Sequence, residues 1–254
     1  MQAFETVVVG GITTARLTRS ELARQMVQDC RLSRAGELTV PRVVIASNGA
    51  SIATFHREAS FRDLLDQADI IDADGMPLVL ATRLLCKRPL QERVATTDFI
   101  HDASDAAVEN GLRFFFLGAL PGVAALAAKA LTARHRGLEI VGIRDGYFNK
   151  EDEPAICEEI VASGADVLWL GLGTPHQEAF AIANRHRLSG LAWIRTCGGL
   201  FDHCAGLRRR APAWMQTAGL EWLHRAALEP RRLGTRYLKT NPSAAYHLAT
   251  KTHD

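Results

Sequence analysis

The segment Ala68-Asp69-Ile70-Ile71-Asp72-Ala73-Asp74-Gly75-Met76-Pro77 decides how the rest of the chain is interpreted. Its apolar residues predict a short buried strand, and Pro77 predicts the start of a helix just beyond a tight turn. Carboxylates are costly to bury unless they are paired or used, so Asp72 and Asp74 need an explanation. Asp74 could cap the following helix, or it could be the reactive group of an active site. Gly75 beside it would let the backbone pass close to a ligand.

Apolar runs and helical patterns alternate on both sides of this segment. Runs with the length of a buried strand lie at residues 6–9, 42–46, 70–71, 112–117, 139–142, 166–170 and 191–196. Helical patterns follow at about residues 18–30, 121–134, 152–161 and 175–185. Repeated strand–loop–helix units predict an α/β fold, with a Rossmann-like, mainly parallel sheet that carries helices on both faces.

Glycines and polar side chains gather where these strands are expected to end, and ligands of such sheets bind beyond the carboxyl ends of the strands. Gly118 follows one strand, and Gly171 and Gly173 follow another, so a phosphate could approach free backbone N–H groups there. Glycine is also common at ordinary turns of this kind. Gln177 lies on the first turn of the next helix, so its side chain is expected near the same crevice. Two such turns in one sheet favour a nucleotide or sugar-nucleotide ligand.

Arg93 and Asp98 flank the start of another predicted helix. Arginine binds diphosphates through bidentate, charge-assisted hydrogen bonds, so Arg93 in the same crevice would suit a nucleotide diphosphate. The alternative is an exposed ion pair between the two side chains.

The composition fits one sizeable core, either as a single domain or as a domain with an appendage, because the chain has 254 residues and 47% of them are hydrophobic. No apolar run approaches the ~20 residues of a membrane span, and the N-terminus lacks the basic and apolar regions of a secretory signal. Five scattered cysteines form no C-x-x-C pair, which predicts reduced thiols in the cytosol. The spacing of His203 with its neighbouring cysteines matches no zinc pattern, so no metal is expected there.

The C-terminal part of the chain is strongly basic. Residues 208–239 contain eight basic and two acidic side chains, a net charge of +6, whereas the whole chain carries +2. Tryptophans and leucines are mixed with these arginines, and this pattern predicts a helical appendage at residues 207–254 beside a sheet domain at residues 1–206. Three roles fit this appendage: nucleic-acid binding, a solvated basic helix, or contact with a membrane surface. We favour the membrane and expect no nucleic-acid partner, because no nucleic-acid-binding motif is present.

A series of motifs runs along the chain in a fixed order. It consists of Asn48, Ala73-Asp74-Gly75, Glu92-Arg93-Val94, Phe116-Leu117-Gly118, Asp145-Gly146-Tyr147-Phe148, Gly171-Leu172-Gly173-Thr174-Pro175-His176-Gln177-Glu178, Gly198-Gly199-Leu200-Phe201-Asp202, Arg209-Arg210-Ala211-Pro212, Gly219-Leu220-Glu221-Trp222 and Glu229-Pro230-Arg231-Arg232. From about residue 5 to residue 242, this series resembles the WecG/TagA/CpsF family of bacterial glycosyltransferases.

The resemblance implies an inverting transfer of a sugar from a UDP-sugar to a hydroxyl of a polyprenyl-diphosphate-linked saccharide. The product would be a precursor of an exopolysaccharide or cell-wall polymer, made by a peripheral protein on the cytoplasmic face of the membrane. In this comparison Asp74 matches the general base, while Asn48, Arg93 and Gln177 match positions around the donor. We assign to the donor site Ser47, Asn48, Gly75, Arg93, Asp98, Gly118, Gly171, Gly173 and Gln177.

The resemblance also assigns a role to the basic appendage. Arg225, Arg232 and Arg236 match arginines that reach the diphosphate of the acceptor lipid, and we expect Arg210 to join them.

Three positions depart from the family pattern. Ala46-Ser47-Asn48 stands where the family usually has T-x-N, so the threonine hydroxyl is missing and Ser47 carries the hydroxyl that could replace it. Pro77 and Thr96 stand where the family usually has glycine. These changes affect the donor sugar and the pocket geometry more than the reaction class. UDP-N-acetylmannosamine, its uronic acid, UDP-glucose and UDP-glucuronate all remain candidate donors.

The chemistry itself is compatible with these assignments. Inversion needs a carboxylate that takes the proton of the acceptor hydroxyl, and burial would raise the pKa of Asp74 toward that use. In an alternative mechanism, Asp72 and Asp74 form a D-x-D pair that holds Mn²⁺. We predict a reaction without metal or other cofactor. The resemblance implies a reaction that needs no metal, and Asp72 lies outside the motifs.

A non-enzymatic alternative is a nucleotide-sensing or nucleic-acid-binding module that uses residues 208–210. For the enzyme, a homo-oligomer that loosens at the membrane is a further expectation.

Overall fold

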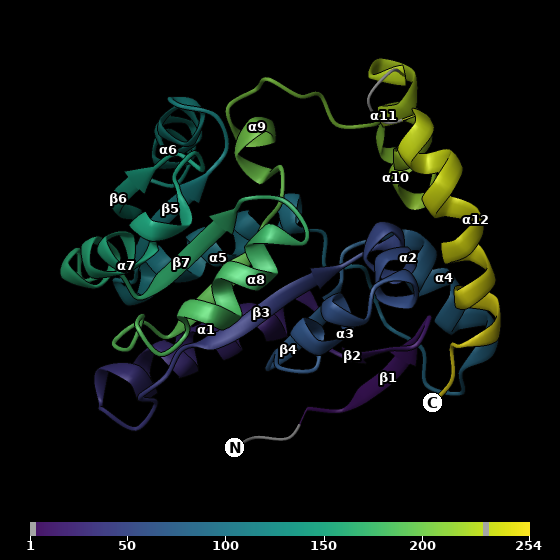
Figure 1. Cartoon of the computed structure of the whole chain (residues 1–254), viewed down its shortest axis with the longest axis horizontal. Helices are drawn as coiled ribbons and strands as arrows, with labels where there is room; N and C mark the ends of the chain where they lie inside the picture. The colour runs from purple at the N-terminus through teal and green to yellow at the C-terminus, as the bar shows by residue number, and fades with distance from the viewer. Residues whose placement is uncertain (1–3, 231–233) are drawn as a thin grey trace.

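A computed structural model describes residues 4–230 and 234–254 of the protein (Figure 1). Its central sheet has six strands, all parallel, in the order β4-β3-β8-β7-β5-β6. These strands are β3 (Arg42–Ser47), β4 (Ile70–Ala73), β5 (Arg113–Gly118), β6 (Glu139–Arg144), β7 (Val167–Gly171) and β8 (Trp193–Thr196). The predicted α/β class with a parallel sheet is confirmed.

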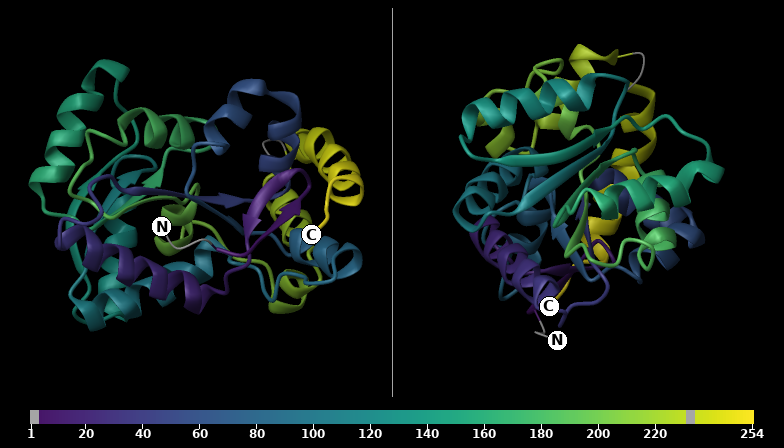
Figure 2. Two further views of the ribbon diagram at one scale, coloured as in Figure 1. Left: turned by 90° about the horizontal axis from the view of Figure 1, so that it is seen from below. Right: turned by 90° about the vertical axis from the view of Figure 1, so that its left-hand side faces the viewer.

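Helices cover both faces of this sheet (Figure 2). One face carries α1 (Arg19–Arg34), α5 (Thr96–Asn110), α6 (Val123–Arg134) and α9 (Leu200–Cys204). The other carries α2 (Gly49–Arg57), α3 (Ala59–Leu65), α4 (Met76–Leu85), α7 (Glu153–Ala162, preceded by the 3-10 turn η1, Lys150–Asp152) and α8 (His176–Asn184).

The two cores follow directly from the alternation of side chains along a strand. In β5, Phe114 and Phe116 pack into one core, while Phe115 and Leu117 pack into the other. Strands buried on both faces read as continuous apolar runs, which explains why the sequence pattern located them.

A short antiparallel hairpin precedes the sheet. The strands β1 (Thr6–Val9) and β2 (Ile12–Ala15) pair around Gly10 and Gly11, both of which have positive φ. The sequence analysis predicted the first strand and missed the second, because Ile-Thr-Thr-Ala is short and follows the glycines that were taken as the end of the run.

The C-terminal segment is helical among its described residues, as expected, and consists of α10 (Ala213–Thr217), α11 (Glu221–Leu228) and α12 (Thr235–Thr250). The inner face of α12 packs on α2, where the rings of His56 and His247 stack with centroids 3.4 Å apart. Leu248 belongs to the core, and the backbone N–H of Val8 donates to the carbonyl of His253. The last helix is therefore held by the same core as the sheet.

Within residues 4–230 and 234–254, no helix is both long and apolar enough to cross a membrane.

Candidate functional site

Asp74 lies at the carboxyl end of β4, one residue beyond the strand, and its backbone N–H donates to the carbonyl of Ser47 at the end of β3. The carboxylate does not cap α4, whose N-cap is Gly75 and which has no side-chain cap. Its Oδ1 instead accepts the N–H of Thr96, the first residue of α5, at 3.1 Å. Oδ2 has no hydrogen-bond partner among the described residues. The capping alternative considered for α4 is therefore excluded, and one carboxylate oxygen is left to accept a proton.

The environment of Asp74 favours its protonated form. Burial and the nearby negative charge of Asp72 raise its pKa to about 6, against the opposing effects of the Thr96 N–H and of Arg195. A carboxylate with such a pKa is still ionised near neutral pH and is a stronger base than an exposed aspartate.

Asp72 has a different partner. Its side chain is fully buried and forms an ion pair with Arg195 of β8, which is also fully buried and lies over the ring of Phe99. Both carboxylate oxygens of Asp72 accept hydrogen bonds from this guanidinium. Burial raises the pKa of Asp72, and the charge of Arg195 counters that effect. Arg195 was not predicted as a site residue, because an arginine inside a strand pattern gives no signal that it is buried.

Among the described residues, no group of three or more His, Cys, Asp or Glu side chains is arranged to hold a metal ion.

Arg93 and Arg210 meet around the carboxylate of Asp98. Arg93 donates to Asp98 at 3.2 Å, and Arg210 forms a bidentate ion pair with the same carboxylate. The side-chain oxygen of Gln216 accepts from Arg93 at 2.6 Å and from Arg210 at 2.8 Å, and Glu221 accepts from Arg93 at 3.0 Å. The predicted pair of Arg93 and Asp98 is thus present, but it is partly buried and is extended by the C-terminal segment.

This arginine cluster joins the sheet domain to the helices that follow it. Burial raises the pKa of Asp98, but the hydrogen bond and charge of Arg210 and the charge of Arg93 outweigh burial, so the pKa lies below its ordinary value. The cluster also lies close enough to Asp74 for the charge of Glu221 to contribute to the raised pKa of that carboxylate. Gln216 and Glu221 were missed as site residues. Glu221 stood in a motif, but nothing in the sequence showed which side chain it would meet.

Asn48 lies beside the turn that carries Asp74 and Gly75. It is the N-cap of α2, and its Oδ1 accepts the N–H groups of Ala50 and Ser51. A Cβ on Gly75 would lie 3.9 Å from the Cβ of Asn48, so the two turns adjoin. The Nδ2 of Asn48 makes no hydrogen bond to the described residues and can serve a ligand. The hydroxyl of Ser47 is buried without a hydrogen-bond partner. Ser47 follows Ala46, the position where the family usually has threonine.

The predicted glycines occupy the ends of the central strands. Gly118 has a φ of 146°, and a Cβ there would lie 2.4 Å from the carbonyl oxygen of Gly171. A Cβ on Gly171 would in turn lie 2.8 Å from the carbonyl oxygen of Gly198. These glycines are therefore required by the close approach of neighbouring turns. Gly173, with a φ of 79°, has open space around it, so it is the glycine best placed to adjoin a ligand.

Gln177 ties two of these turns together. Its Oε1 accepts the N–H of Gly198 at 3.0 Å, and its Nε2 donates to Glu178 at 2.9 Å. The side chain of Gln177 is buried, so its main contacts are within the protein. Burial raises the pKa of Glu178, although Gln177 and Thr174 donate hydrogen bonds to it.

The predicted acceptor-binding arginines are only partly covered by the structure. Arg225 lies in α11, near His203, and its side chain makes no hydrogen bond or ion pair within residues 4–230 and 234–254. Arg232 lies outside the described residues, and Arg236 is placed in α12 by its backbone alone. Arg210 belongs to the cluster around Asp98.

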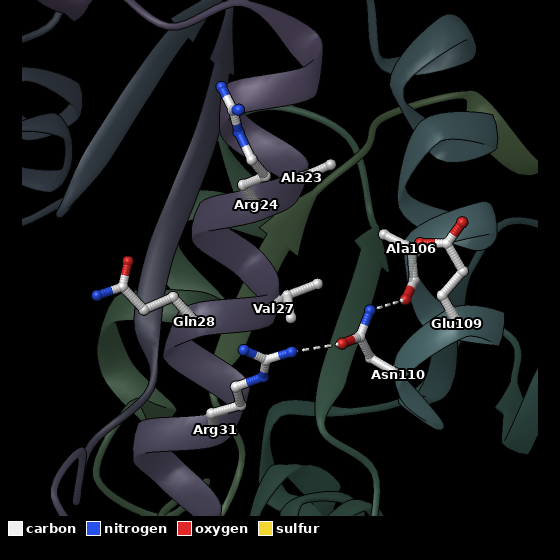
Figure 3. A pocket seen from close by; sticks show the side chains of 8 residues that line it. All are labelled: Ala23, Arg24, Val27, Gln28, Arg31, Ala106, Glu109 and Asn110. Atoms are coloured by element: carbon white, nitrogen blue, oxygen red, sulfur yellow. Dashed lines mark hydrogen bonds between the residues drawn. The ribbon is translucent and has the colours of Figure 1, made fainter.

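Two hollows lie outside these contacts. A groove of about 690 Å³ runs between α1 and α5, where Figure 3 shows Arg31 donating to Asn110 across it, and none of the predicted site residues lines it. A second hollow of about 430 Å³ is lined by residues of α6, of the end of β6 and of the segment just after β6, which contributes Asp145 and Tyr147. It adjoins the predicted donor residues, since a Cβ on the neighbouring Gly146 would lie 3.1 Å from the Cα of Gly118.

The chain matches one family model along nearly its whole length. The model describes the glycosyl transferase WecG/TagA/CpsF family and matches residues 7–253. The match includes the Asp74 turn, the arginine cluster and the C-terminal helices.

Proposed function

The chain belongs to the WecG/TagA/CpsF family of glycosyl transferases, and we propose that it moves a sugar from a UDP-sugar to a hydroxyl of a polyprenyl-diphosphate-linked saccharide, with inversion at the anomeric carbon. The observation that carries this proposal is the position of Asp74. It ends a strand at the ligand-binding edge of a parallel sheet, has a raised pKa, and has one oxygen free to accept a proton.

In this mechanism, Asp74 acts as the general base. The acceptor hydroxyl attacks the anomeric carbon from the face opposite UDP, and its proton passes to Oδ2 of Asp74 as the new C–O bond forms. The bond from the anomeric carbon to the diphosphate breaks, and its electron pair leaves with UDP. The N–H of Thr96 holds Oδ1, so the carboxylate is oriented before the acceptor arrives.

The leaving diphosphate needs positive charge, and the arginine cluster lies close enough to Asp74 to supply it, since the charge of Asp74 contributes to the raised pKa of Arg210. Arg93 and Arg210 share Asp98, Gln216 and Glu221 as partners. Phosphate oxygens can replace carboxylate oxygens in such bidentate contacts, so the donor would enter by exchanging partners within this cluster. When the donor is absent, the carboxylates of Asp98 and Glu221 hold the two arginines in place.

The buried pair of Asp72 and Arg195 supports the version without a metal. A D-x-D pair would need Asp72 to turn a carboxylate oxygen toward an ion, but both of its oxygens are engaged by Arg195. Removing Asp72 from that pair would leave the buried arginine uncompensated, which is strongly unfavourable.

For the acceptor, we propose the diphosphate of a lipid carrier at the cytoplasmic face of the membrane. Arg225 supports this assignment, because it is a cation on α11 without an acidic partner among the described residues. Residues 207–254 would thus form the acceptor-binding part and residues 1–206 the catalytic part.

The test is UDP release from a panel of UDP-sugars, with and without a polyprenyl-diphosphate-linked sugar, each repeated in EDTA. We expect release with one donor, dependent on the acceptor and unchanged by EDTA. Loss of release in EDTA would instead assign Asp72 and Asp74 to a metal. No release with any donor would contradict the proposed activity and leave a binding module.

A further inference from the structure

The outer surface of α4 is apolar, although this helix lies at the surface of the protein. Leu80, Leu84 and Leu85 are 38%, 84% and 48% exposed, and Pro77 is exposed as well. Pro77, Leu80 and Leu84 follow one another at helical spacing, so they form a single stripe. The opposite side of the helix is also apolar, because Leu78 and Val79 are fully buried in the core. A surface helix usually turns polar side chains outward, so this stripe needs an explanation.

The outer face of α12 has the same character. Its inner face is defined by Thr240, Ala244 and Leu248, which are buried against the rest of the protein. The exposed positions on the other side include Leu238, which is 78% exposed, and Tyr246. Pro242, Ala245 and Ala249 fall between and beside them, and all three are exposed.

These two helices lie side by side. In Figures 1 and 2 both are found at the end of the molecule opposite α6 and α7, and they contact each other. The backbone N–H of Lys87, just beyond α4, donates to the carboxylate of Asp254, just beyond α12. Their apolar stripes can therefore belong to one continuous surface.

The charge of this surface has one sign. Neither α4 nor α12 contains an acidic residue, and the cations along them and just beyond α4 include Arg83, Lys87 and Lys239. The acids nearest to the end of α4 are paired, since Glu5 binds Arg88 and Asp254 binds Arg16. An apolar surface edged by unopposed cations is complementary to an anionic lipid bilayer.

This surface also adjoins the proposed active site. Asp74 and Gly75 lead directly into α4, and a Cβ on Gly219, between α10 and α11, would lie 3.4 Å from the ring of Pro77. A bilayer that contacts α4 would therefore lie next to the turn that carries the base.

We propose that the outer faces of α4 and α12 together form a docking surface for an anionic membrane, so that the catalytic domain itself contacts the bilayer through Leu80 and Leu84. This inference rests on the proposed lipid-linked acceptor, and it adds a contact from outside the basic C-terminal segment. The docked leucines enter the acyl boundary, while Arg83 and Lys87 reach the headgroups.

The experiment is co-sedimentation of the full chain with vesicles of equal parts phosphatidylglycerol and phosphatidylcholine, without donor or acceptor. Variant Leu80→Gln/Leu84→Gln should bind these vesicles at least about tenfold more weakly, a change of about 1.4 kcal/mol, because it removes two apolar side chains from the acyl boundary. The matched control is Leu126→Gln in α6, since Leu126 is about half exposed but lies at the other end of the molecule, and it should bind like the unchanged protein. UDP affinity, measured in the same preparations, reports whether each variant is folded.

Three results would overturn the inference: a wild-type chain that ignores the vesicles, a double variant that binds as well as the control, or a wild-type dimer in solution that the double variant converts to a monomer. The last result would show that the stripe is an interface between copies of the chain. Vesicle binding that depends on the leucines in a protein without UDP-sugar transfer would keep the surface and reject the proposed function instead.

Discussion

Replacing Asp74 by Asn should stabilise the protein, and the size of the effect should depend on pH. The folded protein raises the pKa of this carboxyl from its ordinary value of 3.8 to about 6. Because a tenfold change in proton affinity corresponds to about 1.4 kcal/mol, this rise in pKa opposes folding by at most about 3 kcal/mol once the group is ionised. Asp74 keeps some exposure to solvent, so we expect about 1–3 kcal/mol.

The sign follows from the direction of the shift. Below the unfolded pKa both states carry a proton, and the ionised form has no influence on stability. As the pH rises through about 6, the folded state must hold an unfavourable charge, and the stability present at low pH is lost. Asn carries no charge and can still accept the N–H of Thr96, so Asp74→Asn removes only this loss.

The assay is urea unfolding of both proteins at several values between about pH 4 and pH 8. The two curves should coincide near the acid end and separate by about 1–3 kcal/mol at the other. Asp63→Asn, at an exposed position of α3, is the matched control and should change stability by less than about 0.5 kcal/mol at any pH. An Asp74→Asn protein that is less stable than the unchanged one near neutral pH, or a difference that does not vary with pH, would refute the account of this carboxyl.

Three further substitutions test separate parts of the structure. Asp72→Asn should lower the free energy of unfolding, measured with urea, by about 3–5 kcal/mol, because it leaves the charge of Arg195 buried and unpaired. A loss of less than about 1 kcal/mol would argue against the ion pair. Gly118→Ala should lower the free energy of unfolding by more than about 2 kcal/mol in the same assay, because its Cβ would lie 2.4 Å from the carbonyl oxygen of Gly171. The control Gly36→Ala, at an open position with positive φ, should lose only about 1 kcal/mol. Arg225→Ala should raise KM for the lipid-linked acceptor several-fold and leave UDP affinity unchanged, and a variant with normal acceptor kinetics would remove Arg225 from the acceptor site.

The sheet was predictable because its strands are covered on both faces. Runs such as Phe114 to Leu117 contain only apolar residues, and the turns after them carry glycines, so the strands and their carboxyl ends could be located. The second strand of the N-terminal hairpin was missed because Ile12 to Ala15 is short and half polar.

The candidate site was predictable only in part. Asp74 stood out because an acid at the end of a buried strand is unusual. The partners of Arg93 could not be identified, because Gln216 and Glu221 lie more than a hundred residues away and meet it only through the packing of the C-terminal segment. Asp72 and Asp74 looked alike in sequence, and only the buried position of Arg195 separates the ion-paired Asp72 from Asp74, whose pKa is raised to about 6.

Acceptor-dependent UDP release by the unchanged protein and by Asp74→Asn, followed from about pH 5 to pH 8, tests the central claim most directly. We predict that kcat/KM of the unchanged protein rises with an apparent pKa near 6, and that the variant loses about 10²–10⁴-fold in rate while it still binds UDP. A variant that transfers sugar at an undiminished rate, with the same dependence on pH, would contradict the assignment of Asp74 as the base.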